Sequence, residues 1–329
     1  MTTNWYSLPI DVLSCHLFTY LNPTDLLNIL VSHKCKDTII TSMDHHCFFH
    51  CFASKSNQLA VVIEQVKAIR RLLQLTMDKV TTIQIRFHQM KYNIMTQCQS
   101  PVPAVVIDFS GLQIIGTSNV KASPEQPVTI LQRLQISNGA NVSIHNLHIV
   151  NNCNEIEDLH QPFTHLSGIT VSDHGTVAKL FNCKISNRPL INRINNESKY
   201  DAFDYWSRTE AHGLVVINGA RVETENCMFE ENGKSGIFVR GLGSQVTVLN
   251  GDLNNNQDYG GQVERSGLLT LLGHTKVHHN KWYGLGCYGR GSIITIASLE
   301  CIVAENTNDS YGSKYGYVKE HGVIQLLCE

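Results

Sequence analysis

A seven-residue motif that recurs through the second half of the chain constrains the fold more than any other feature. The motif opens with a polar or small residue, has an apolar residue at its centre and usually ends with Asn. Copies span Asn146–Asn152, Asn226–Asn232, Asn250–Asn256, His274–Asn280 and Glu300–Asn306, with a shortened copy at Asn182–Asn187. The central residues are Ile149, Ile185, Phe229, Leu253, Val277 and Val303, at intervals of 36, 44, 24, 24 and 26. Such a period is the signature of a solenoid.

The period predicts a stack of coils, each of about 24 residues and three short strands. One coil cannot bury its inner face alone, whereas stacked parallel coils about 4.8 Å apart can. The Asn residues at equivalent corners should then form a ladder of amide hydrogen bonds. A second apolar position lies at Val142, Val222, Val246 and Ile296, and the chain restarts at Gly168, Gly213, Gly236, Gly267, Gly284 and Gly316. We interpret Cys183, Cys227 and Cys301 as a column of small buried residues.

The length in excess of 24 residues falls mostly between the ladder Asn and the restarting Gly. The candidate insertions are 153–167, 188–212, 257–266 and 307–315. Insertions at one corner of a solenoid map to one face, often the binding face. The second insertion is rich in residues typical of binding hot spots, which makes it the candidate substrate-binding segment. Its anchors would be Arg193, Tyr200, Tyr205, Trp206 and Arg208, unless these side chains pack onto the solenoid wall instead.

Residues 1 to about 80 differ from the rest of the chain, because their apolar residues recur at helical spacing. Leu59, Val62, Ile63, Val66, Ile69 and Leu73 share one face at helical spacing. We therefore divide the chain into a helical domain (1–52), a linker or capping helix (53–82) and the solenoid (83–329). The helix over 59–75 would link the two parts and could cover the open edge of the sheet stack.

Residues 7–47 resemble an F-box. The matching stretches are Leu8-Pro9-x-Asp11-Val12-Leu13, Phe18-x-Tyr20-Leu21-Asn22-Pro23-x-Asp25-Leu26-Leu27 and Val31-Ser32-x-Lys34. The pattern departs from the family by one extra residue before Leu21, by about one missing residue before Val31, and by Cys35 in place of a Trp. The resemblance implies an adaptor-binding surface made of Leu8, Pro9, Val12, Leu13, Leu21, Leu26, Leu27 and Val31. A small helical cap is the alternative.

Residues 83–329 look like the right-handed, single-stranded parallel β-helix of the pectin-lyase-like fold, and Val106–Gly116 is similar to its first coil. The expected fold class is thus mainly β, with a small all-α F-box domain in front. F-box plus β-helix is the architecture of a class of F-box-only proteins. This resemblance implies docking to a Skp-type adaptor on a cullin ligase, with the β-helix receiving the substrate for ubiquitination.

Polysaccharide cleavage is the main alternative, because the same fold hosts lyases and hydrolases. A hydrolase needs two carboxylates about 5–9.5 Å apart. The candidates are Asp158, Asp173, Asp201, Asp204, Asp252 and Asp258. The polygalacturonase motifs are missing from the chain, and His212-Gly213 matches them only in part. We therefore expect no enzymatic activity and no cofactor. A non-catalytic scaffold with a degenerate F-box is a third interpretation.

Two groups of residues that include histidines are candidates for a metal-binding site. His46, Cys47, His50 and Cys51 would pair at i, i+4 if they lay on a helix. Their spacing matches no standard zinc finger, so a helical core is the better interpretation. His274, His278 and His279 fall at one corner of the solenoid and are interpreted as surface residues. No metal site is predicted.

Charge and composition restrict the classes of binding partner and the cellular compartment that we expect. The net charge is −2, so no basic field favours nucleic acid or anionic lipid. Charged residues make up 16% of the chain, against about 25% in typical globular proteins, which argues against a coiled coil or a disordered chain. The N-terminus has no signal-peptide pattern and no apolar run is long enough to cross a bilayer. With eleven Cys, we expect reduced thiols in a cytoplasmic or nuclear protein that is not secreted.

Overall fold

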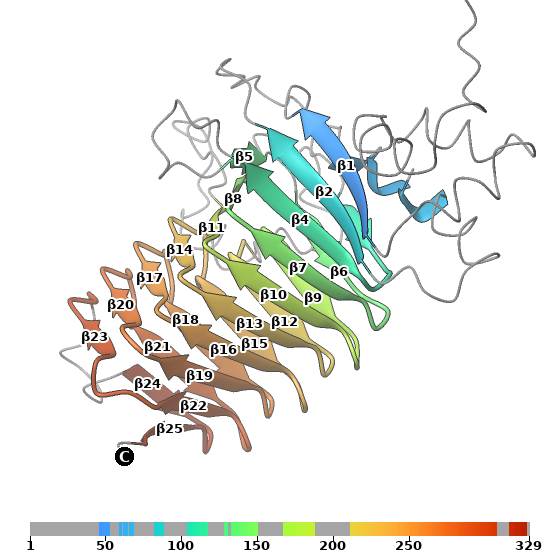
Figure 1. Ribbon diagram of the computed structural model, residues 1–329. Coiled ribbons are helices and arrows are strands. Elements are labelled where there is room, and N and C mark those ends of the chain that lie inside the picture. Colours follow the sequence, from blue (N-terminus) through green and yellow to red (C-terminus); the bar gives the residue numbers. More distant parts are fainter. Residues whose placement is uncertain are drawn as a thin grey trace, which may run out of the picture.

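The computed structural model shows a solenoid of three parallel sheets (Figure 1). It describes residues 46–52, 59–60, 62–64, 66–68, 82–88, 104–117, 128–130, 133–150, 167–187, 211–307 and 316–327. All paired strands in these residues run parallel, and strands that are neighbours in a sheet come from successive coils. The fold is therefore a parallel β-helix, as the period predicted.

Each sheet takes one strand from every coil. Sheet A contains β1 (His46–Phe52), β2 (Thr82–His88), β4 (Leu112–Thr117), β7 (Asn141–His145), β10 (Val177–Phe181), β13 (Arg221–Glu225), β16 (Gln245–Leu249), β19 (Leu268–Leu272), β22 (Ile293–Ile296) and β25 (Val323–Leu326). Sheet B contains β3 (Val105–Ile107), β6 (Leu134–Ile136), β9 (Ile169–Ser172), β12 (Leu214–Ile217), β15 (Ile237–Arg240), β18 (Gly261–Glu264), β21 (Leu285–Tyr288) and β24 (Gly316–Lys319). Sheet C contains β5 (Val128–Ile130), β8 (Leu147–Val150), β11 (Lys184–Ser186), β14 (Met228–Glu230), β17 (Asp252–Asn254), β20 (Lys276–His278) and β23 (Ile302–Ala304). From β3 onward the chain visits the sheets in the order B, A, C, so each coil has a B–A corner, an A–C corner and a C–B corner.

The central apolar residues of the motif form one inward column, as expected. The strand registers align Ile149, Ile185, Phe229, Leu253, Val277 and Val303 in successive strands of sheet C. All but the last are fully buried, and Val303 packs against the same core. Alternation along each short strand turns the neighbouring residues outward, which keeps one face of the sheet apolar.

Three positions of the predicted repeat are wrong. Ile294, rather than Ile296, aligns with Val246 through Leu269. Strand β18 begins at Gly261, so the restarting glycine is Gly260 and not Gly267, and segment 257–266 is a regular part of the coil rather than an insertion. Gly316 itself pairs with Leu285, one residue beyond the restart. Near Ile296 and Gly316 a corner is a few residues longer than in the neighbouring coils, and the local pattern cannot show where the extra residues lie. The corner before Gly260 has the regular length, and there the second Gly-apolar pair, Gly267-Leu268, explains the wrong assignment.

The predicted asparagine ladder runs through the C–B corner. The Oδ1 atoms of Asn232, Asn256, Asn280 and Asn306 accept hydrogen bonds from the backbone N–H of the ladder residue one coil earlier, at 2.9, 3.2, 3.1 and 3.0 Å. The side-chain amides of Asn232, Asn256 and Asn280 donate to the next Oδ1 at 2.8–2.9 Å. Buried amide groups need hydrogen-bond partners, and here each coil supplies the partners for the amides of the neighbouring coil.

Glycine at the restart position is required by this ladder. A Cβ atom on Gly236 would lie 2.8 Å from the carbonyl oxygen of Gly260 and 2.9 Å from Nδ2 of Asn256. Gly213, Gly260 and Gly284 would make equivalent contacts with the ladder amides. The recurrence of Gly in the sequence thus reflects the close approach of the backbone to the asparagine column.

The A–C corner has a different interior. Asn146, Asn182, Asn226 and Asn250 adopt φ values of 51–55°, the left-handed conformation that Asn tolerates better than most residues. Behind them lies the predicted thiol column: Cys183 and Cys227 are buried free thiols, and the Cys183 N–H lies 3.4 Å from Sγ of Cys227. The register continues the column through Gly251 and Thr275 to Cys301, which is only partly buried.

Among the described residues, the segment 46–52 departs from the helical expectation for the N-terminal region. Residues 46–52 form strand β1, which pairs with β2 along its whole length. The segment contains aromatic residues that favour strands, and its partner is 36 residues away in sequence, so a local pattern did not reveal it. Residues four apart in a strand are separated by about 13 Å. The i, i+4 pairs on which a zinc site at His46, Cys47, His50 and Cys51 depended are therefore absent.

Helical residues occur where the apolar stripe predicted them, within 59–68. Leu59, Val62, Ile63 and Val66 are buried in the same hydrophobic core as Ile85 of β2 and Ile107 of β3. Lys67 pairs with Asp108 just after β3, at 3.1 Å. These contacts place the helical residues beside the first strands of the solenoid. Ile69 and Leu73 lie outside the described residues, and the division of the chain at 52 and 82 stays a prediction.

Candidate binding site on the outer face of sheet B

The last coils carry aromatic and acidic side chains on the outer face of sheet B. In β18, β21 and β24 the residues Gly261, Leu285 and Gly316 align, as do Val263, Cys287 and Val318. Val263 and Cys287 are fully buried, so these two aligned positions define the inward side of the sheet. The alternate residues therefore point outward, which gives Gln262 and Glu264, then Gly286 and Tyr288, then Tyr317 and Lys319. Together with the residues that precede each strand, they form the candidate site.

Five aromatic residues from successive coils gather there, and we call them the aromatic cluster. They are Tyr259, Trp282, Tyr283, Tyr288 and Tyr317. The ring of Tyr259 lies 6.2 Å from both Trp282 and Tyr283 and 5.9 Å from Tyr288, between centroids. Tyr317 extends the cluster, at 5.4 Å from Tyr283 and 5.7 Å from Tyr288. Trp282 is 39% exposed, so the cluster presents an aromatic surface to solvent.

Gly286 makes room for the centre of this cluster. A Cβ atom there would lie 2.7 Å from Cε1 of Tyr259, because the Tyr259 ring lies over the Gly286 backbone of the next coil. The hydroxyls of Tyr259 and Tyr288 are hydrogen-bonded to each other. Burial raises the pKa of both phenols above the ordinary value, so both remain protonated at neutral pH. The pair therefore acts as a neutral hydrogen-bonding group.

Two carboxyl groups flank the cluster. Burial raises the pKa of Asp258 to about 6, with a smaller opposing effect from Lys234 and a further rise from Glu264. Glu264 ends strand β18 and accepts a hydrogen bond from Nε2 of Gln262 at 3.0 Å. Gln262 in turn accepts one from the Ser235 hydroxyl at 2.8 Å. One carboxyl group with a raised pKa beside a second, hydrogen-bonded one is an arrangement that can bind a cation or support acid–base chemistry.

His212, which lies in a preceding coil, borders the same outer face of sheet B. His212 is 3% exposed, stacks on Phe238 at 4.6 Å, and its Nδ1 accepts a hydrogen bond from the Ser235 N–H at 3.3 Å. These contacts are those of a buried, packed histidine. The histidine of the His212-Gly213 pair, which partly matches the polygalacturonase motif, therefore has packing contacts that fit a structural role.

The residues that sequence predicted for binding lie outside the described part of the chain. This applies to the adaptor-facing set (Leu8, Pro9, Val12, Leu13, Leu21, Leu26, Leu27 and Val31) and to the substrate-facing set (Arg193, Tyr200, Tyr205, Trp206 and Arg208). The described chain breaks at 151–166, 188–210 and 308–315, each time between a strand of sheet C and one of sheet B. Three of the predicted insertions thus share the C–B corner, which is also where Asp258, Tyr259, Trp282 and Tyr283 lie.

The three predicted carboxylates that the structure describes lie on different parts of the coil. Asp173 lies in the B–A turn and accepts a hydrogen bond from the Asn138 N–H, Asp252 belongs to sheet C, and Asp258 precedes sheet B. Asp158, Asp201 and Asp204 are outside the described residues. Sequence reasoning missed the aromatic cluster and Glu264. The signal was available, because Asp258 and Trp282, Tyr259 and Tyr283, and Glu264 and Tyr288 are each 24 residues apart.

Comparison of the chain with protein-family models, with curated proteins and with solved structures finds no match. The class of protein, a parallel β-helix, is therefore defined by its geometry. Across the described ranges, no helix has the length and apolar character needed to span a membrane. In the same residues, no three His, Cys, Asp or Glu side chains are grouped so that they could hold a metal ion.

Proposed function

We propose that this protein is the substrate-recognition subunit of an SCF-type (cullin–RING) ubiquitin ligase. Its F-box-like segment would dock to a Skp-type adaptor on a cullin, and its β-helix would bind a protein substrate. The observation that carries the proposal is the F-box-like pattern of residues 7–47 ahead of a parallel β-helix. The chain itself would not be an enzyme and would need no cofactor, because it acts by holding a substrate lysine near a conjugating enzyme.

The proposal includes a finer description of the fold and the setting. We infer a right-handed, single-stranded coil of the pectin-lyase-like kind, since crossovers between parallel strands are right-handed in nearly all proteins. The low net charge supports a protein partner rather than nucleic acid or membrane. The expected compartment is the cytoplasm or the nucleus.

The substrate would bind at the C–B corner and the adjoining face of sheet B. Tyr and Trp are enriched among residues that dominate binding energy, and the aromatic cluster offers an exposed Trp282 and the half-buried Tyr283, Tyr288 and Tyr317 around the buried Tyr259. Arg193, Tyr200, Tyr205, Trp206 and Arg208 belong to an insertion that leaves the solenoid at the same corner. Both sets of residues could therefore contact one partner.

A pull-down from eukaryotic lysate tests the adaptor half of this proposal. The parent chain should recover the Skp-type adaptor and cullin, whereas the double variant Leu8→Ala, Pro9→Ala should lose both. The variant Trp282→Ala serves as the matched control, because it should keep the adaptor and lose bound substrate. Failure of the folded parent to recover adaptor would refute the ligase proposal and leave two candidates, a non-catalytic scaffold and a carbohydrate-binding or polysaccharide-cleaving protein.

One observation favours a second candidate, a carbohydrate-binding or polysaccharide-cleaving protein. Burial, with a smaller effect of the Glu264 charge, raises the pKa of Asp258 to about 6 beside the aromatic cluster, and such a carboxyl group could act as a general acid. Aromatic rings also provide flat apolar surfaces on which sugar rings can stack.

Binding and cleavage assays on a panel of acidic and neutral polysaccharides test this candidate. Activity that is lost in both Asp258→Asn and Glu264→Gln, but kept in Asp173→Asn, would support catalysis at this site. Binding without cleavage, lost only in Trp282→Ala, would support a carbohydrate-binding role. The absence of both in the folded parent would exclude this candidate.

A further inference from the structure

Two adjacent histidines on the outside of sheet C meet ring to ring. His278 ends strand β20, and His279 follows with a φ of 54°. Consecutive side chains of a regular strand point to opposite faces, but the left-handed conformation at His279 turns the chain. Nδ1 of His278 consequently lies 2.5 Å from Nδ1 of His279, with the ring centroids 4.8 Å apart. The two nitrogens face each other along one line, which is the geometry of a hydrogen bond between the rings.

The preceding coil has two asparagines in the same arrangement. Asn254 aligns with His278, and the next residue, Asn255, has a φ of 53° where His279 has 54°. Nδ2 of Asn255 donates a hydrogen bond to Oδ1 of Asn254 at 2.6 Å. A left-handed residue directly after a strand of sheet C thus brings two neighbouring side chains into hydrogen-bond contact in both coils. A pair of amides does not titrate, whereas a pair of histidines does.

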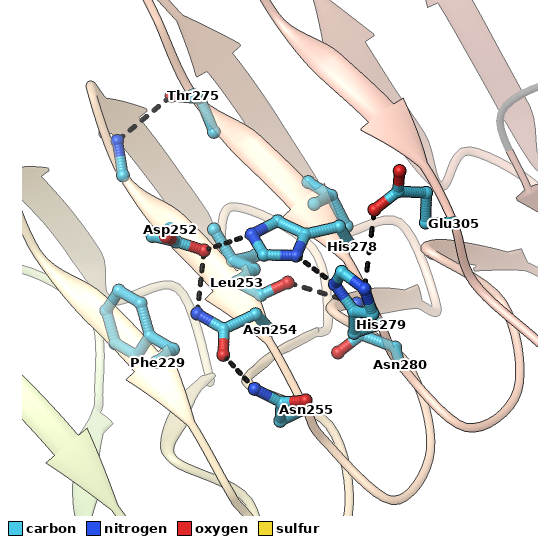
Figure 2. A network of polar contacts seen from close by, with 12 residues as sticks. Phe229, Asp252, Leu253, Asn254, Asn255, Thr275, His278, His279, Asn280 and Glu305 are labelled. Carbon is cyan, nitrogen blue, oxygen red and sulfur yellow. Dashed lines mark hydrogen bonds and ion pairs between the residues drawn. The ribbon is translucent and has the colours of Figure 1, made fainter.

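A carboxylate lies at the far nitrogen of each histidine ring, as Figure 2 shows. Nε2 of His278 lies 3.0 Å from Oδ1 of Asp252 in the preceding coil, and Nε2 of His279 lies 3.3 Å from Oε2 of Glu305 in the following coil. Asp252 also accepts a hydrogen bond from the Asn254 side-chain amide at 2.7 Å. Ionised carboxylates only accept hydrogen bonds, so both Nε2 atoms carry a proton. The contacts therefore form one chain of carboxylate, imidazole, imidazole and carboxylate across three coils.

Other charged side chains surround this chain of contacts. Lys276 lies on the same outer face two residues before His278, is exposed, and aligns with Asp252 in the neighbouring strand. Lys281, just beyond the corner, is exposed, and its Nζ donates to Gln257 at 3.2 Å. One strand further back, Glu230 forms an ion pair with Lys184. The charged groups that the histidine ring nitrogens contact are the two carboxylates.

The number of protons on the two rings follows from these contacts. With both Nε2 atoms protonated, two neutral rings would turn the lone pairs of their Nδ1 atoms toward each other. Two charged rings would instead bring two N–H groups together. A pair of one neutral imidazole and one imidazolium is the combination that forms the Nδ1–H···Nδ1 hydrogen bond and keeps both carboxylate contacts.

We propose that His278 and His279 share one proton and act as a pH-sensitive link between three coils of the solenoid. The link is complete only while the pair holds one proton, and it is lost when that proton leaves or when a second one binds. It joins the coils of Asp252, His278 and Glu305 directly before the C–B corner, where Trp282 follows three residues after His279. Solvent reaches the rings, whose side chains are 25% and 54% exposed, so the pair can exchange protons with water.

The contribution of this link to stability should pass through a maximum. The folded pair holds one proton, whereas two unfolded histidines hold about two protons well below pH 6.5, about one at pH 6.5 and almost none well above it. Stability rises with pH where the unfolded state binds more protons, and it falls with pH where the folded state binds more. The contribution of the pair to the free energy of unfolding is therefore largest near about pH 6.5 and declines on both sides.

A double variant of the full-length chain tests the proposal. His278→Asn combined with His279→Asn reproduces the hydrogen-bonded amides of Asn254 and Asn255, so it should fold and keep a link that does not titrate. Urea denaturation between about pH 5.5 and about pH 7.5 gives the unfolding equilibrium constants of the variant and the parent. Their ratio, variant to parent, should be greatest near about pH 6.5 and about threefold smaller at either end. A ratio that is independent of pH, or that changes in one direction only, would overturn the proposal.

A single histidine beside a carboxylate provides the matched control. His274 lies on the same outer surface, 71% exposed and 3.5 Å from Glu300. His274→Gln removes a histidine that has a carboxylate neighbour without touching the ring pair, so its ratio to the parent should show no maximum. Nitrogen NMR of the histidine rings gives a direct measurement. Near about pH 6.5 the parent should show one proton shared between two Nδ1 atoms, and this signal should vanish in the double variant. Finding both Nδ1 atoms unprotonated there would equally overturn the proposal.

Discussion

Two corners of the same coil are filled in opposite ways. At the C–B corner the interior is polar, and Asn187, Asn232, Asn256, Asn280 and Asn306 are buried and hydrogen-bonded from coil to coil. At the A–C corner the interior holds the small side chains of the thiol column, and the polar Asn146, Asn182, Asn226 and Asn250 stand at the turn instead. The difference shows that hydrogen bonds specify the residues of the C–B corner, whereas the size of the side chains specifies those of the A–C corner.

The largest effect is expected from breaking the ladder at Asn256. Asn256→Ala removes the amide that donates to the Phe229 carbonyl and to Asn280, and it leaves the Asn232 N–H and amide without their acceptor. Each buried unpaired group costs about 1–3 kcal/mol, so we expect a loss of about 4 kcal/mol in the free energy of unfolding. Urea denaturation measures it. Asn255→Gly, next to it on the exposed side, should change stability by less than about 1 kcal/mol.

The next effect concerns the backbone that approaches the ladder. Gly236→Ala places a methyl group within 2.9 Å of Asn256 and Gly260, so the coils must separate, at about 2–3 kcal/mol. Gly139→Ala provides a control with open space but a φ of 72°, which should cost about 1 kcal/mol. Thermal unfolding of the two variants separates the steric effect from backbone strain. Equal losses would contradict the close approach at Gly236.

Asp258, on the outside of the C–B corner, should make the free energy of unfolding depend on pH. The pKa of Asp258 is raised to about 6 in the folded protein, so ionisation of Asp258 opposes folding above that pH and has no effect below about pH 4. Asp258→Asn should therefore stabilise the protein by about 2 kcal/mol at pH 8 and leave it unchanged at pH 4. Equal stabilisation at pH 8 and pH 4 would contradict a pH-dependent effect of Asp258. Unfolding curves at the two pH values decide between these outcomes.

The smallest effect is expected at the A–C corner. Cys227→Ala removes one buried sulfur and its weak hydrogen bonds to the preceding coil, so the loss should be about 1 kcal/mol. Denaturation under reducing conditions measures it. A loss as large as that of Asn256→Ala would show that the thiol column is as specific as the asparagine ladder.

The regular parts of the fold could be predicted because every coil repeats the same environment. The Asn ladder, the apolar column through Phe229 and Leu253, and the thiols at Cys183 and Cys227 each recur at the period, so one pattern identifies them all. Strand β1 was missed because its pairing with β2 joins segments 36 residues apart. Gly260 was missed because a second Gly-apolar pair, at Gly267-Leu268, follows shortly after it.

The sequence by itself thus determined a parallel β-helix with an asparagine ladder, because inward positions have identical neighbours one period away. Only the tertiary structure decided the outer surface. Tyr259 meets Tyr288 and lies over Gly286, and His278 meets His279 between Asp252 and Glu305. Except for the contact between His278 and His279, which belong to one coil, these contacts join outward groups from different coils. They depend on strand register and on single left-handed residues at the corners, neither of which the repeat period specifies.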